Sequence, residues 1–259
     1  MYRTLDPDKI VATLDQLVAR ISERFPGAGL ARVCSELKLV AAESRARTDR
    51  LAKPNIALRA LSGLVVVTGV GVLIYVARQI NVQSATTELF GMLQGIEATV
   101  NLLIVVGAAV LFLTTLEGRW KRTSALADLY QLRSIVHVID MHQLTKDPAG
   151  ALHPADDTAS SPRRIRNAQE LVRYLDYCSE MLSLSSKVAA LYAQSTTDAQ
   201  VIDAVNELER LTTNLSQKIW QKINIVERSR PAPAEVAAAT SSAAHASAAA
   251  TTTTTAKAS

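Results

Sequence analysis

Two long apolar runs dominate the pattern of hydrophobic and polar positions along the chain. Residues 61–77 read LSGLVVVTGVGVLIYVA without a charge, and this run extends back to Ile56 if Arg59 reaches the headgroups. Residues 98–116 read ATVNLLIVVGAAVLFLTTL, with Asn101 and three threonines as the only polar side chains. About 20 helical residues cross a hydrocarbon core of roughly 30 Å. The pattern predicts two membrane-spanning helices; the alternative is a pair of helices buried in a large soluble protein.

Charges close to the two runs predict how the hairpin is oriented. Only Arg78 is basic in the connecting stretch 78–95, whereas nine basic residues flank the other ends of the runs. Those nine are Arg45, Arg47, Arg50, Lys53, Arg59, Arg119, Lys121, Arg122 and Arg133. Because basic flanks stay in the cytoplasm, both termini are expected there and the short turn outside. The charged first fifty residues lack a signal peptide, so the first run is expected to be an uncleaved anchor in a multi-pass protein.

Outside the two runs, apolar residues recur at three- and four-residue steps, which is the period of an amphipathic helix. Residues 1–54 are predicted to form two helices, the first capped by Asp6 with Pro7 in its first turn. These helices either lie on a membrane or a partner, or pack on the rest of a helical bundle, and the second alternative is favoured. No proline interrupts the stretch from Glu117 to Lys146, so the helix of the second run is expected to continue beyond it.

The C-terminal half carries two apolar seams, over residues 125–144 and 165–226. The stretch 145–163 between them contains three prolines and is predicted to be a loop. Such seams are typical of a packed bundle or coiled coil, and they are also candidates for binding a partner. Their selected members are Leu129, Leu132, Val136, Ile139, Leu171, Leu175, Leu182, Leu208, Leu215 and Ile219.

These patterns predict an all-α protein, in which a transmembrane helical hairpin is continuous with a cytoplasmic helical bundle or coiled coil. Four parts are expected. They are the N-terminal amphipathic helices 1–54, the two-span hairpin 55–118, the bundle 119–228 and an Ala/Ser/Thr/Pro tail 229–259. The tail is predicted to be disordered, because it has almost nothing to bury beyond alanine methyl groups.

Composition removes several classes of protein. The 259 residues include Lys+Arg 28 and Asp+Glu 24, with aromatic residues at 4%. A net charge of +4, without basic clusters between aromatic residues, argues against nucleic-acid binding. The only cysteines, Cys34 and Cys178, fall at apolar helical positions and are interpreted as reduced core residues. No phosphate-binding loop, nucleophile elbow or paired CxxC is present, so neither an enzymatic activity nor a cofactor is predicted.

The densest group of potential metal ligands lies in RSIVHVIDMHQLTKDP. His137 and Asp140 are one helical turn apart, whereas His142 is five residues from His137 and points elsewhere. Metal ligands on one helix face are usually three or four residues apart, so these three residues are weak candidates for a metal site. The favoured interpretation is structural, with Asp140 bonded to His137 or to the backbone.

Polar residues near the two runs are the other candidates for function. Arg59, Glu97 and Asn101 are the intramembrane polar candidates, and Glu97 and Asn101 share one helix face near the outer end of the second run. A carboxylate within a membrane suggests a conduction path or a charged partner. An interfacial, solvated Glu97 is favoured, because it lies only about one turn inside the expected boundary. Glycines such as Gly63, Gly69 and Gly71 suggest close helix contacts.

Three segments carry a resemblance to a known group: HVIDMHQLTKDP, LVRYLDYCSEMLSLSSKVAALYAQ and VNELERLTTNLSQKIWQKINIV. Together they resemble a bacterial group of uncharacterised two-span membrane proteins, over about residues 56 to 228. The resemblance implies a bacterial inner-membrane location and no particular activity. In architecture alone, the chain is also similar to SLATT domains, which are proposed pore-forming effectors, and this likeness assigns no functional residue.

Two functional hypotheses follow. The first is a membrane-anchored scaffold or adaptor, in contact with the lipid bilayer, whose cytoplasmic seams self-associate or bind a cytosolic protein. The second is an oligomeric channel or membrane-permeabilising effector with Glu97 and Asn101 facing a lumen. The scaffold is favoured, because the predicted spans offer few polar side chains to line a water-filled pore.

Overall fold

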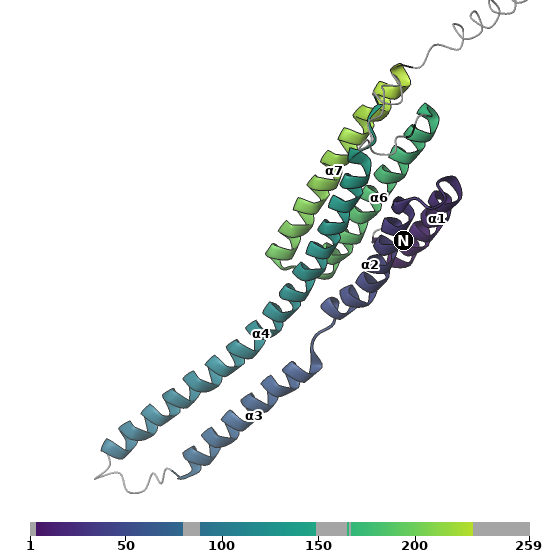
Figure 1. The fold of residues 1–259 in the computed structure, drawn as a ribbon. Coiled ribbons are helices and arrows are strands. Elements are labelled where there is room, and N and C mark those ends of the chain that lie inside the picture. The colour runs from purple at the N-terminus through teal and green to yellow at the C-terminus, as the bar shows by residue number, and fades with distance from the viewer. Residues whose placement is uncertain (1–3, 80–88, 149–164, 166, 230–259) are drawn as a thin grey trace, which may run out of the picture.

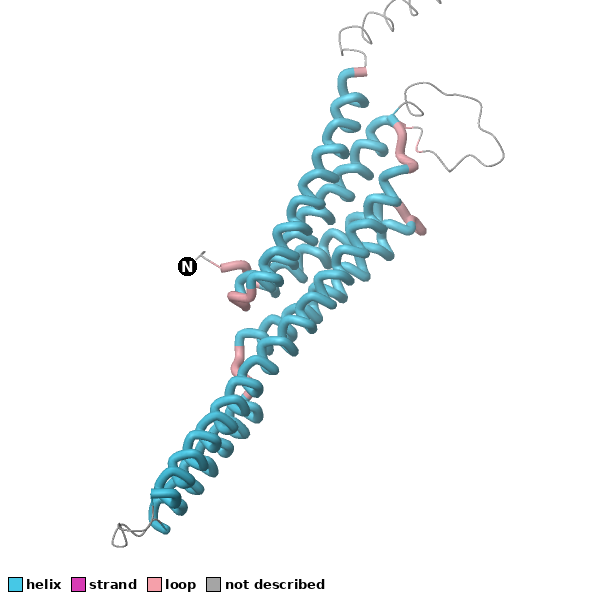
Figure 2. The backbone as a smooth tube through the Cα atoms, turned by 90° about the vertical axis from the view of Figure 1, so that its left-hand side faces the viewer, coloured by secondary structure: helices cyan, strands magenta, loops and turns pink. Residues whose placement is uncertain are grey.

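The computed structural model describes residues 4–79, 89–148, 165 and 167–229, and within them all regular structure is helical. The helices lie in an elongated arrangement, with a bundle at one end and a two-helix hairpin at the other (Figures 1 and 2). In chain order they are α1 (Pro7–Arg24), α2 (Gly29–Ala52), α3 (Ile56–Gln79), α4 (Leu89–Leu144), α6 (Ala168–Ser195) and α7 (Ala199–Arg228). The predicted all-α class is confirmed. The expected outer turn, most of the loop 145–163 and the tail from residue 230 lie outside the described residues.

Local chemistry sets where the first two helices begin and end. Asp6 caps α1 by accepting a hydrogen bond from the backbone N–H of Asp8 at 2.9 Å, and Pro7 occupies the first helical position. After α1 the chain turns at Gly27, whose φ of 75° lies in the left-handed region that favours glycine. This turn folds α2 back against α1, and both helices pack on α6. The N-terminal pair therefore belongs to the bundle.

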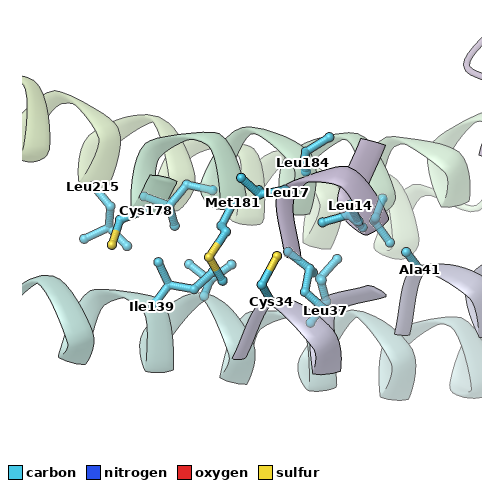
Figure 3. Packing of buried hydrophobic residues seen from close by; sticks show 14 of the residues in the cluster. Leu14, Leu17, Cys34, Leu37, Ala41, Ile139, Cys178, Met181, Leu184 and Leu215 are labelled. Atoms are coloured by element: carbon cyan, nitrogen blue, oxygen red, sulfur yellow. The ribbon is translucent and has the colours of Figure 1, made fainter. Parts of the chain in front are cut away.

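The bundle core is formed by α1, α2, the C-terminal half of α4, α6 and α7. All ten predicted seam residues are buried in it, from 0% exposed for Leu175 and Ile219 to 4% for Leu215. Figure 3 shows Ile139, Met181 and Leu37 among the packed side chains, together with both cysteine sulfur atoms. Helical periodicity predicted this packing correctly.

The same ten residues are also predicted to bind a partner, and their burial sets a condition for that role. Their side chains contact neighbouring helices of the same chain, so a partner would reach them only after the bundle opened. The physical reason is that each of the five helices has one apolar face, and this face is buried in the shared core of the bundle. A surface for partners must therefore be sought among the exposed side chains of the bundle.

The hairpin consists of α3 and the N-terminal half of α4, which lie side by side in both views (Figures 1 and 2). Both helices are long and apolar enough to cross a membrane. Only 6% and 0% of their most apolar 18-residue windows are buried. The alternative of two helices buried in this chain's own core is thus wrong, because their apolar side chains are largely exposed.

A narrow contact line joins α3 to α4. Half-buried side chains follow each other at three- and four-residue steps, and Gly69 of α3 faces Val106 of α4. A Cβ atom at Gly69 would lie 2.6 Å from Val106 Cγ2, so glycine is needed for this approach. No neighbouring atom lies within 4 Å of a Cβ placed at Gly63 or Gly71. Among these three glycines the expected close approach is therefore confirmed at Gly69 alone.

Candidate site at the junction of bundle and hairpin

The potential metal ligands do not converge. His137 is exposed, and Asp140 accepts a hydrogen bond from Gln143 Nε2 at 2.6 Å rather than one from His137. His142 is half-buried, with its Nδ1 3.4 Å from the hydroxyl of Tyr174. Among the described residues, no three His, Cys, Asp or Glu side chains are placed to hold a metal ion.

His142 instead fills a space between helices. Its Cε1 would lie 2.8 Å from a Cβ at Gly29, so the glycine that starts α2 makes room for the imidazole ring. Burial lowers the pKa of His142, and the nearby charges of Lys146 and Arg32 lower it further. A neutral imidazole packed against α2 and hydrogen-bonded to Tyr174 is a structural group.

The intramembrane candidates lie away from the α3–α4 contact line. Glu97 and Asn101 are both exposed, and their helical positions place them on the face of α4 opposite the half-buried Leu102 and Val106. Arg59 is exposed in the first turn of α3, close enough to interact with the charge of Glu117. The hairpin therefore presents Glu97 and Asn101 outward rather than enclosing them.

Polar contacts are concentrated where α2 passes into α3, beside α4. The backbone N–H of Asn55 donates to Glu117 Oε1 at 2.9 Å, and Lys121 Nζ forms an ion pair with Glu117 at 3.0 Å. Lys121 also donates to the carbonyl oxygens of Leu51 and Lys53, at 3.2 and 2.7 Å. These bonds satisfy backbone groups at the end of α2, which would otherwise lack partners. They fasten the connection between bundle and hairpin to α4.

One helical turn or two further into the bundle, a buried polar cluster joins three helices. Asp128 of α4 forms an ion pair with Arg47 of α2 and accepts a hydrogen bond from the hydroxyl of Tyr192 at 3.1 Å. The Tyr192 hydroxyl also lies 3.1 Å from Ser44 Oγ. Burial raises the pKa of Asp128, and the charge of Arg47 opposes that rise. Burial likewise raises the pKa of Tyr192, so its hydroxyl stays protonated and acts as a donor.

A cavity of about 710 Å³ opens beside these contacts, between the α2–α3 connection and α4. We call it the junction cavity. It is lined by Arg47, Arg50, Leu51, Lys53, Pro54, Asn55, Ile56, Ala57, Trp120, Lys121, Ser124, Ala127 and Asp128. Four of these residues are basic and one is acidic, so the lining is positively charged.

Sequence reasoning missed the junction cavity and the buried cluster. A signal for the cluster was present, because Asp128 interrupts an apolar helix face between Ala125 and Leu132. A carboxylate at such a position needs a buried partner, and the period of the helix cannot name it. The basic residues at the junction were recognised only as an indication of orientation.

The cysteines carry no reactive thiol. Cys34 and Cys178 are both fully buried, and burial raises the pKa of each thiol to about 12. A thiol in that state is a poor nucleophile near neutral pH, which agrees with the interpretation of both residues as core residues.

Comparison with known proteins assigns no family and no function to the chain. No protein-family model, no curated protein and no solved structure matches the chain.

Proposed function

We propose that the protein is an integral membrane scaffold or adaptor, whose hairpin crosses a bacterial inner membrane and whose helical bundle recruits protein partners in the cytoplasm. The α3 helix has 24 residues and is therefore about 36 Å long, enough for a hydrocarbon core of roughly 30 Å. Basic residues flank the bundle ends of the spans, which supports a cytoplasmic position for the bundle and both termini.

The single observation that carries this proposal is the continuity of α4. This helix of 56 residues contributes half of the hairpin and then a core element of the bundle. Because the backbone hydrogen bonds continue through the junction, the bundle is held at a defined distance from the membrane rather than on a flexible linker. That arrangement suits an anchor and requires no catalysis or cofactor.

The recruiting surface that fits best is the outward face of α4. Tyr130 and Met141 lie on the side of α4 away from the buried seam and are 62% and 66% exposed, and Leu144 at the end of the helix is 64% exposed. Exposed aromatic and methionine side chains are enriched in protein interfaces, where they contribute much of the binding energy. A second copy or a cytosolic helix could pack there without opening the bundle.

The alternative function is an oligomeric channel or membrane-permeabilising effector of the SLATT-like kind. The outward position of Glu97 and Asn101 favours it, since several hairpins arranged in a ring could turn these side chains toward a common lumen. It ranks second, because the outward face of the hairpin is otherwise almost entirely apolar.

Native mass spectrometry of the protein extracted from membranes at natural expression distinguishes the two. The scaffold proposal expects a monomer or dimer with a stoichiometric cytosolic protein. It also expects that protein to be lost from Met141→Glu/Leu144→Glu. The matched control is Leu39→Glu/Ile225→Glu, which changes two apolar side chains that are 53% and 52% exposed on other helices.

Two results would overturn the proposal. A homogeneous ring of about four or more copies without another subunit would favour the channel, and conductance of Glu97→Gln would then be measured. Retention of the partner by the Met141→Glu/Leu144→Glu variant would show that the outward face of α4 does not recruit it.

A further inference from the structure

The junction cavity has an unusual position. It lies where the apolar hairpin begins, and residues from the end of α2, the start of α3 and the middle of α4 form its wall. If the hairpin spans a membrane as proposed above, this level coincides with the headgroup region of the cytoplasmic leaflet. The cavity is large enough for a phospholipid headgroup with its glycerol backbone, because small-ligand sites commonly measure about 300–1,000 Å³.

Two of its four basic residues are available to bind an anion. Arg47 is engaged with Asp128 and Glu43, and Lys121 with Glu117 and two backbone carbonyl groups. Arg50 and Lys53, by contrast, have no ion-pair partner within the part of the chain that the structure describes. The only carboxylate of the lining is already paired, so the cavity keeps an uncompensated positive charge.

The side of the cavity toward the hairpin is apolar and aromatic. Ile56 is 79% exposed, and Trp120 is 67% exposed just beyond the apolar run of α4. Tryptophan is enriched at the interface between membrane and water, because its ring packs on glycerol and acyl groups while its N–H remains hydrated. A ligand that satisfies both sides of the cavity needs an anionic head and an apolar body.

We propose that the junction cavity binds the phosphate headgroup of an anionic phospholipid from the cytoplasmic leaflet. Arg50 and Lys53 would hold the phosphate oxygens, and the acyl chains would lie along the exposed apolar surface at the start of α3. A basic pocket beside transmembrane helices on the cytoplasmic side is a known geometry for recognising anionic lipids. The proposal rests on the membrane insertion argued above. It adds a specific lipid to the general attraction between basic flanks and a membrane.

Trp120 provides a direct test, because the chain has only one other tryptophan, Trp220 on α7. Full-length Trp220→Phe is reconstituted into phosphatidylcholine nanodiscs that contain a small fraction of phosphatidylglycerol. Bromine atoms, which quench tryptophan fluorescence on contact, are placed on the acyl chains of either the phosphatidylglycerol or the phosphatidylcholine. We expect brominated phosphatidylglycerol to quench the fluorescence of Trp120 by much more than its fraction of the total lipid would give. Adding Arg50→Gln/Lys53→Gln should reduce this preference by about thirtyfold, the scale of two basic charges acting on an anionic lipid at a membrane surface.

The matched control removes the same charge at the same level. Arg59 and Arg119 are exposed near the junction but do not line the cavity, so Arg59→Gln/Arg119→Gln should retain most of the preference. If both double variants lost the preference for phosphatidylglycerol equally, the preference would come from the general attraction between basic residues and an anionic membrane surface. That result would overturn the proposed site. Soluble glycerol phosphate should relieve the quenching only at concentrations far above that of the lipid, because it lacks the acyl chains. Relief at a concentration equal to that of the lipid would identify a site for free phosphate compounds and overturn the lipid.

The same experiment separates this inference from the proposed function. Equal quenching by both brominated lipids, in proportion to their shares, would leave the membrane anchor intact and remove the lipid site. Absence of quenching by either lipid would mean that Trp120 does not lie at a membrane, and the anchor itself would fall.

Discussion

The hairpin and the bundle use the same apolar residue types in opposite ways. In the bundle, Leu175 is fully buried, whereas Leu64 of the hairpin is 62% exposed. The bundle has apolar residues on one face of each helix, and the hairpin has them on all faces. Burying apolar surface stabilises a fold in water, so a helix that exposes such surface on all sides fits an apolar surrounding.

The passage from one arrangement to the other occurs within α4. Over little more than three turns the helix passes from exposed apolar side chains to Glu117, then Lys121 and then the buried Asp128. Glu117 binds Asn55 in the α2–α3 connection, Lys121 binds the end of α2, and Asp128 binds Arg47 of α2. A single continuous helix thus combines an apolar half with a half that packs in the bundle, and polar contacts with the neighbouring helix region mark the change.

The largest expected effect tests the difference in burial directly. Leu175→Ala should lower the free energy of unfolding by about 2–5 kcal/mol, because it removes buried methyl groups and leaves a cavity. Leu64→Ala should change it by less than about 0.5 kcal/mol. Urea unfolding in detergent, followed by circular dichroism, measures both. Equal losses would show that the exposed face of α3 is covered by protein in an assembled form.

An intermediate effect is expected at the contact line of the hairpin. Gly69→Ala places a methyl group against Val106 and should destabilise the hairpin by about 1–3 kcal/mol, the usual cost of overpacking. Gly71→Ala is the matched control, because no atom lies within 4 Å of its Cβ position. Thermal unfolding in detergent is the measurement. Recovery in Gly69→Ala/Val106→Ala would locate the cause, and identical behaviour of the two single variants would contradict the packing of α3 on α4.

The smallest effect concerns the pH dependence of the bundle. Burial raises the pKa of Asp128 above its ordinary value of 3.8, so the folded chain binds this proton more tightly than the unfolded chain. The free energy of unfolding should therefore fall as the pH rises from about 3.8 through the raised value. Asp128→Asn removes this contribution, because an amide does not titrate in that range.

Urea unfolding of the wild type and of Asp128→Asn across this pH window measures the contribution as a difference. Asp203→Asn on α7, an exposed position, controls for the loss of one carboxylate. A wild-type advantage that grows with pH would show instead that the attraction of Arg47 outweighs the burial of Asp128.

The prediction from sequence succeeded where residues close together in the chain determine the outcome. Helical period identified the ten seam residues, and Asp6 with Pro7 identified the start of α1. It did less well with polar residues. His137 and Asp140, one turn apart, form no pair, whereas Asp128 binds Tyr192 from a distant helix. A polar side chain is satisfied by whichever element folds against it, and its neighbours in sequence do not specify that element.

The amino-acid pattern alone was enough to predict the helical structure of the described residues, two helices apolar enough to cross a membrane and the continuation of α4 past the second apolar run. These properties follow from the local period and length of apolar patterns. Three features emerged only from the folded arrangement: the seams close on one another, Glu97 and Asn101 face outward, and basic residues line the junction cavity. Each of these three features depends on which helices pack together. Helix packing is determined by the burial of all the amphipathic faces together, and no single stretch of sequence specifies it.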